Sequence, residues 1–227
     1  MKRILALSTI FCLLLAFTTG CNKEEKTVPE VVPEEEELKA AEETVTGFLD
    51  AYLSGNEDCD GFFTKTGKET FDKRLKEDQD AYIKMWTDIN FNVPSLEDYA
   101  KKALDTARNY TTIKQTESKK ANDIITVTVT GSQPDLNMTL NKITSAAGLP
   151  NGGFSQNIVE FFDMSVDEFN EKYGDNAKQT YDEALLKNIF ANYDKVCEAA
   201  DKKSKTWVFT LVKENGKWLI CDYYRES

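Results

Sequence analysis

Few side chains in this sequence could carry out acid–base or metal chemistry. The chain of 227 residues contains no histidine, which excludes a Ser-His catalytic triad and most zinc sites. Two acidic features remain as candidates, the segment 56–61 and Asp222. The first would bind a cation through oxygen ligands, and the second would act as a general base in proton transfer.

Residues 56–61 read Asn-Glu-Asp-Cys-Asp-Gly and begin like a calcium-binding loop, with oxygen-bearing side chains at the first, third and fifth positions and glycine at the sixth. The twelfth position of such a loop is a glutamate that binds calcium through both oxygens, and here it is Gly67. We therefore interpret the segment as a solvated turn, and we predict no metal and no cofactor.

Asp222 lies in a C-terminal hairpin whose strands, 207–213 and 217–224, flank Asn215-Gly216, a pair typical of a type I′ turn. The pairs predicted by an uninterrupted register are Leu211/Ile220, Phe209/Asp222 and Trp207/Tyr224. Asp222 would then lie on an apolar face, where burial raises the pKa of a carboxyl group. We favour a packing or hydrogen-bonding role for it, because no pair of oxyanion donors can be assigned.

The elements that must position these residues follow from hydrophobic periodicity. Helical spacing predicts helices within 38–52, 62–89 and 95–104. Alternation then predicts strands over 110–116 and 125–129, with a charged loop at 118–120 between them.

Helical spacing returns over 134–200, ahead of the C-terminal hairpin. The sequence thus predicts a single α+β domain over 38–227. Its N-terminal helices pack on a curved, cone-like antiparallel sheet, and residues 134–200 form a helical insertion.

Both faces of the final hairpin are largely apolar, so we expect both to be covered. The N-terminal helices would cover one face. Residues 134–200 or a second subunit would cover the other, and the second alternative implies a homodimer through the sheet face.

The N-terminal residues are typical of an export signal. Lys2-Arg3 precedes an apolar run over 4–17, which at 14 residues is too short to span a bilayer that needs about 20. Thr19-Gly20-Cys21 resembles the lipobox of bacterial lipoproteins, although Thr18 replaces the usual leucine. The resemblance implies that residues 1–20 are removed and that Cys21 carries an acyl anchor of the palmitate type, which attaches the protein to the cell membrane outside the cytoplasm.

Residues 21–37 are polar and acidic, contain two prolines and are expected to form a tether. The whole chain has a net charge of -11, and removal of residues 1–20, with two positive and no negative side chains, makes it -13. Nucleic acid is therefore not a predicted partner, because it requires faces rich in lysine and arginine. The only membrane contact that we predict is through the lipid.

Three cysteines remain after processing: Cys59, Cys197 and Cys221. A disulfide between Cys59 and Cys197 with Cys221 free is one alternative, and three free thiols are the other. The sequence does not give the Cα spacing that a disulfide requires, so both stay open.

Two further segments carry a family resemblance. Residues 48–56, Phe-Leu-Asp-Ala-Tyr-Leu-Ser-Gly-Asn, and residues 213–220, Lys-Glu-Asn-Gly-Lys-Trp-Leu-Ile, resemble the first helix and last hairpin of nuclear-transport-factor-two-like, or cystatin-like, domains found in Gram-positive lipoproteins. The resemblance implies a conical pocket between helices and sheet. It is compatible with a domain of unknown function that binds a small apolar ligand or an envelope protein without catalysis, which we favour. The alternative is a ketosteroid-isomerase-like enzyme with Asp222 as base.

Overall fold

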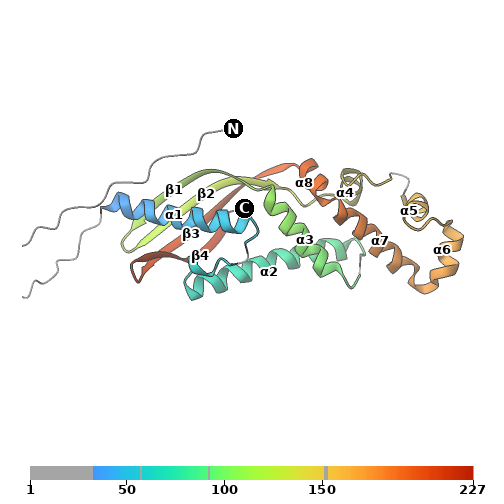
Figure 1. The fold of residues 1–227 in the computed structure, drawn as a ribbon, viewed down its shortest axis with the longest axis horizontal. Helices are drawn as coiled ribbons and strands as arrows, with labels where there is room; N and C mark the ends of the chain where they lie inside the picture. The colour runs from blue at the N-terminus through green and yellow to red at the C-terminus, as the bar shows by residue number, and fades with distance from the viewer. Residues whose placement is uncertain (1–32, 57, 92, 151–152, 227) are drawn as a thin grey trace, which may run out of the picture. The chain divides into compact units, whose positions relative to one another are not determined.

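The computed structural model describes residues 33–56, 58–91, 93–150 and 153–226 (Figure 1). The predicted signal segment, the predicted lipid-bearing Cys21 and the part of the predicted tether up to residue 32 lie outside the described residues. The elements in chain order are α1 (Glu34–Leu53), η1 (Asp60–Phe62), α2 (Lys65–Asp88), α3 (Leu96–Asn109), β1 (Thr112–Ala121), β2 (Ile124–Pro134), α4 (Leu140–Ala146), α5 (Gly153–Phe162), α6 (Val166–Tyr173), η2 (Gly174–Asn176), α7 (Ala177–Ala191), α8 (Tyr193–Ala199), β3 (Lys202–Glu214) and β4 (Lys217–Glu226).

The first two helices have clear physical causes. α1 has four glutamates in its first turn, where negative charge is stabilised by the helix dipole, and it begins at Glu34, before the apolar pattern starts. α2 is capped by Thr64, whose Oγ1 accepts a hydrogen bond from the amide of Gly67 at 3.1 Å. With 24 residues, α2 is about 36 Å long at 1.5 Å per residue. It is therefore long enough to contribute to two separate cores.

The four strands form one antiparallel sheet in the order β1-β2-β3-β4. The first hairpin turns at Asn122-Asp123, not at the loop predicted over 118–120, since residues 118–120 are paired within β1. The polar side chains there are accommodated by α1: Ser118 donates to Glu42 at 2.6 Å, and Lys120 pairs with Glu37. Two glutamates of α1 thus bind polar side chains of this edge strand, and β1 extends through 118–120 instead of ending before them.

The second hairpin confirms the predicted turn, because Asn215 and Gly216 both have positive φ, at 51° and 79°. The pairing of Leu211 with Ile220 is also confirmed. A β-bulge then interrupts the ladder, so Phe209 pairs with Tyr223 and Asp222 lies opposite Thr210. The predicted pairs Phe209/Asp222 and Trp207/Tyr224 are therefore wrong, since one extra residue in β4 exchanges the faces beyond it.

One face of the sheet carries the first core, which we call the sheet core. Side chains of β2, β3 and β4, among them Val127, Phe209 and Ile220, pack there against α1 and the first half of α2. Phe48 of α1 and Phe71 of α2 are buried at this contact, with ring centroids 5.2 Å apart. The predicted packing of N-terminal helices on an antiparallel sheet is confirmed.

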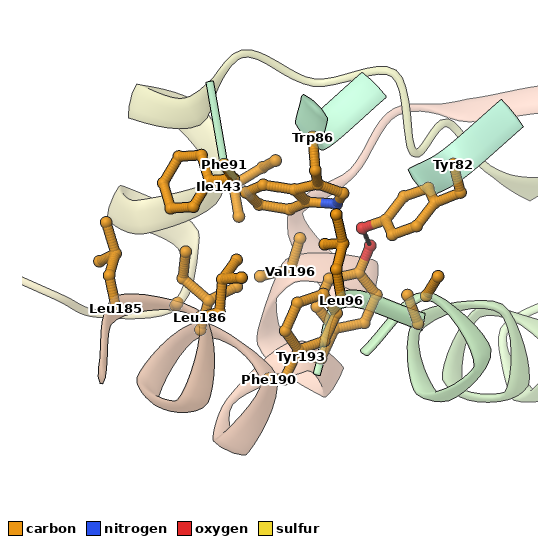
Figure 2. Close-up of a cluster of buried hydrophobic side chains, with 14 of the residues drawn as sticks. Tyr82, Trp86, Phe91, Leu96, Ile143, Leu185, Leu186, Phe190, Tyr193 and Val196 are labelled. Atoms are coloured by element: carbon orange, nitrogen blue, oxygen red, sulfur yellow. Dashed lines mark hydrogen bonds between the residues drawn. The ribbon is translucent and has the colours of Figure 1, made fainter. Parts of the chain in front are cut away.

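A second core, the helical core, joins the second half of α2 and α3 to α4, α7 and α8 of the insertion (Figure 2). Trp86 is fully buried in it, and the hydroxyls of Tyr82 and Tyr193 point at each other, 2.5 Å apart. Burial raises the pKa of Tyr82 to about 12. Both phenols therefore stay protonated at neutral pH, and one donates to the other.

The insertion is present as predicted, but the buried side chains of its α4, α7 and α8 belong to the helical core, which they share with α2 and α3. It therefore does not provide the expected cover for the second face of the sheet. On that face Val208 is buried, whereas Ile124 and Tyr224 are exposed. Cover by a second subunit stays a prediction.

The three cysteines of the described residues are free thiols. Cys59 is buried in the sheet core and Cys197 in the helical core, so the alternative disulfide between them is wrong. Cys221 lies at the bulge and donates to the carbonyl of Thr210 at 3.3 Å. Burial raises the pKa of all three thiols, which disfavours the reactive thiolate.

Candidate functional site

Asp222 does not occupy the apolar position predicted for it. The bulge turns it to the exposed side of β4, where its Oδ1 accepts a hydrogen bond from the amide of Tyr223 at 2.8 Å. Tyr223 takes the place opposite Phe209 on the sheet core, with ring centroids 5.2 Å apart. The side chain of Asp222, the candidate base, is therefore exposed and does not face the sheet core.

The segment 56–61 forms a turn after α1 in its described part, which leaves out residue 57. Oδ1 of Asn56 accepts from the amide of Asp58 at 3.0 Å, and Asp60 lies 3.5 Å from the ammonium of Lys68. Among the described residues, no group of three or more His, Cys, Asp or Glu side chains is arranged to hold a metal ion.

A cleft of about 810 Å³ lies where the sheet core meets the helical core. α1, α2 and α3 contribute to its lining on one side, and the ends of β2, β3 and β4 contribute on the other. Its size falls within the usual range of small-molecule sites, roughly 300–1,000 Å³. This cleft is the candidate functional site.

Aromatic rings form an apolar wall in the cleft. Phe71 of α2 contacts Tyr52 of α1 and Tyr223 of β4 edge-on, with centroid distances of 5.4 and 5.6 Å. Phe48 stacks on Tyr52 at 5.7 Å, and Phe209 lies beside Tyr223. Rings from four elements, α1, α2, β3 and β4, thus pack on one another at the base of the cleft and hold one another in place.

Arg108 of α3 is fixed against this wall. Its guanidinium lies over the ring of Tyr52, 4.1 Å from the centroid, and donates to Asp105 at 2.7 Å and to the carbonyl of Tyr52 at 3.4 Å. Only 16% of its side chain is exposed. Burial raises the pKa of Tyr52, and the charge of Arg108 partly opposes that effect.

Arg225 of β4 occupies another part of the cleft lining, where it pairs with Asp78 of α2. The neighbouring Tyr223 is only 8% exposed and makes no hydrogen bond through its hydroxyl to a described residue. Burial raises the pKa of Tyr223 well above its usual value. The hydroxyl therefore remains protonated at neutral pH and can donate to a bound molecule.

The residue that follows β2 belongs to a third ion pair in the cleft, after those of Arg108 and Arg225. Asp135 pairs with Lys203 of β3 at 2.7 Å and accepts from the amide of Asn137 at 3.1 Å. Burial favours the neutral carboxyl, but Lys203 and this amide outweigh it and hold the pKa of Asp135 below its usual range. Asp135 is thus an ionised partner of lysine.

Sequence reasoning placed only part of this site. Residues 48–56, which carried the family resemblance, contribute Phe48 and Tyr52 to the cleft. Tyr223 and Arg225 were missed because the uninterrupted register assigned that face of β4 to Asp222 and Tyr224. The sequence did contain one indication of this arrangement. Tyr223 is adjacent to Asp222, and a shift of the strand register by one residue brings Tyr223 to the apolar face.

No described helix is both long enough and apolar enough to cross a membrane. Comparisons of the chain with protein-family models, with curated proteins and with solved structures gave no match. The molecule is thus characterised by its architecture: an α+β domain with helices packed on a four-stranded antiparallel sheet.

Proposed function

We propose that this protein is a non-catalytic binding module, attached by a lipid to the outer side of the cell membrane, whose cleft holds a small molecule with an apolar body. The cleft of about 810 Å³ with its aromatic wall is the observation that carries the proposal. Small-molecule sites are usually concave, with apolar side chains that hold the body of the ligand and polar groups that fix its orientation.

Binding is favoured over catalysis by the state of the acids in the cleft. Asp78, Asp105 and Asp135 are each paired with an arginine or a lysine, so these carboxylates are already engaged in ion pairs within the fold. The described lining includes neither serine nor cysteine as a nucleophile. The isomerase alternative is weakened because Asp222 lies outside the cleft.

We further propose that the domain is of the nuclear-transport-factor-two-like, or cystatin-like, type. Helices that cover one face of an antiparallel sheet and leave a cleft beside it support this assignment. The proposal concerns architecture only, because such a fold is compatible with several activities.

The cleft can be tested with N-phenyl-1-naphthylamine, a neutral apolar probe that fluoresces more strongly when it leaves water. We expect saturable binding to the mature protein. Ala81 is an exposed α2 residue that lines the cleft, so Ala81→Trp fills part of the space and should weaken the affinity by about tenfold or more.

Ala191 is the matched control, because it is an exposed helical alanine outside the cleft lining. Ala191→Trp should leave the affinity within about twofold of that of the native protein. No saturable binding, or equal weakening by both substitutions, would contradict the proposed binding function.

The membrane anchor is tested by Cys21→Ser, which removes the acceptor of the lipid. Two acyl chains hold a protein stably because each buried methylene contributes about 0.8 kcal/mol. We expect the variant to stall in processing or to appear in the soluble fraction after membranes are washed. Cys12→Ser, within the signal segment, should remain membrane-bound. A processed Cys21→Ser protein that stays with the membranes would show that another anchor exists.

A further inference from the structure

All three arginines of the described residues, Arg74, Arg108 and Arg225, line the cleft. They come from α2, α3 and β4, so the fold brings them together from distant parts of the chain. Lysine is far commoner in the sequence, yet only three lysines line the cleft. The planar guanidinium group matches a carboxylate or a phosphate through two parallel hydrogen bonds, which favours an anionic ligand group here.

The cleft also has the opposite charge balance from the protein. The net charge of the chain is -11. The cleft lining, by contrast, has six cationic and four acidic side chains, an excess of two positive charges. Charge of one sign within a cleft with low-dielectric walls attracts ligands of the other sign. The cleft therefore favours an anion, although the net negative charge of the whole protein repels one.

The cationic groups retain donors that the fold does not use. Arg225 bonds to Asp78 through one terminal nitrogen of its guanidinium group. Arg74 is 46% exposed and bonds to Glu77 through one nitrogen at 2.9 Å. Each guanidinium group carries five N–H donors, so both arginines can also bond to a ligand.

The hydroxyl of Tyr223 lies near both arginines. Burial raises the pKa of this hydroxyl, and the charges of Arg225 and Arg74 each partly oppose the effect. Its ring packs against Phe71 on the apolar wall. A neutral donor, two cationic groups and an aromatic surface are thus adjacent in the cleft.

We propose that the cleft binds an amphipathic anion, a molecule with one carboxylate or phosphate head and an apolar body. Arg74, Arg225 and the hydroxyl of Tyr223 hold the head. The partly exposed apolar side chains of the lining, such as Leu75 and Met85, hold the body. Arg108 stays fixed by Asp105 and Tyr52 and supplies a stationary positive charge. This inference rests on the proposed binding function and names its ligand class.

The test compares two probes that differ by one charged group. 8-Anilinonaphthalene-1-sulfonate has the same rings as N-phenyl-1-naphthylamine and adds a sulfonate. We expect the anionic probe to bind at least about tenfold more tightly, because hydrogen bonds to charged groups are the strong ones. Arg74→Gln should remove most of that difference, while the affinity for the neutral probe stays the same and shows that the variant is folded.

Lys76→Gln is the matched control, since Lys76 is an exposed cation on the same helix that pairs with Asp80 and lies outside the cleft lining. It should change the affinity for the anionic probe by less than about twofold. Equal affinities for the two probes, or an unchanged affinity for the anionic probe in Arg74→Gln, would overturn the anion assignment and leave the proposed binding function standing. No binding of either probe would contradict the binding function itself.

The nature of the head is settled by displacement of the anionic probe. Dodecanoate and dodecyl phosphate share one apolar chain and differ in the head, and dodecanol supplies the uncharged comparison. Displacement by either anion at concentrations where dodecanol has no effect supports the proposal and identifies the preferred head. Displacement by dodecanol at the same concentration as the anions contradicts it.

Discussion

Gly67→Ala is expected to lower the free energy of unfolding by about 3 kcal/mol, at the upper end of the usual cost of overpacking. Gly67 lies in the first turn of α2, directly against β4. A Cβ added there would lie 2.0 Å from the carbonyl oxygen of Ile220 and 3.0 Å from the Cα of Cys221. These are backbone atoms within the sheet, so the clash cannot be relieved by rotation of a side chain.

The same carbonyl of Ile220 accepts a hydrogen bond from the amide of Thr64 at 2.9 Å. A shift of α2 away from β4 would therefore also weaken this bond and displace Arg74, which α2 carries into the cleft. Denaturant unfolding followed by circular dichroism measures the stability, and the N-phenyl-1-naphthylamine titration measures the cleft.

Gly61 is the matched control for this substitution, because a Cβ there meets no atom within 4 Å. Gly61→Ala should change the free energy of unfolding by less than about 0.5 kcal/mol. Similar stability of the two variants would show that α2 does not approach β4 as closely as described.

Trp86→Ala is expected to lower the free energy of unfolding by about 3–5 kcal/mol, the usual range for truncation of a large buried aromatic side chain. Trp86 is fully buried, and its ring lies 5.4 Å from that of Phe91 and 6.0 Å from that of Phe190 (Figure 2). The substitution leaves a cavity between α2 and the insertion. Because α2 also carries Phe71 in the sheet core, the loss should be seen in the unfolding of the whole domain.

Ile89→Ala provides the comparison for the same end of α2, since Ile89 is 46% exposed. It should cost less than about 0.5 kcal/mol. For each variant, the free energy of unfolding is calculated from the denaturant midpoint and from the slope of the free energy with denaturant concentration. A cost for Trp86→Ala as small as that for Ile89→Ala would mean that the insertion does not share a core with α2.

The local elements could be predicted from the sequence because their causes are local. Asn215 and Gly216 both adopt positive φ, which few other residue pairs tolerate, and this fixes the second hairpin and the pairing of Leu211 with Ile220. The spacing of Val45, Phe48 and Leu49 likewise predicts the buried face of α1.

The bulge in β4 could not be predicted, because it coincides with contacts between distant segments. At this point the first turn of α2 packs against Ile220 and Cys221, and the amide of Thr64 bonds to the strand. An alternating pattern is compatible with either face, and a single extra residue exchanges them. Because of this bulge, Tyr223 lies in the sheet core and Asp222 does not.

The partner of the insertion was also decided by the tertiary structure. Apolar spacing over 134–200 indicates helices with a face to bury, but it does not specify which surface buries that face. The second half of α2 presents Tyr82 and Trp86, and these side chains complete the helical core.

The α+β class, the order of helices and strands and the exclusion of histidine chemistry follow from the amino-acid sequence, because periodicity and composition are local properties. The cleft was decided by tertiary structure alone, since it lies where two cores meet and its lining comes from helices and strands far apart in the chain. Arg74, Arg108 and Arg225 have no common spacing or motif in the sequence. They share one site only because α2 packs against β4 and α3 packs against α2 and β2, and long-range packing of this kind leaves no local pattern.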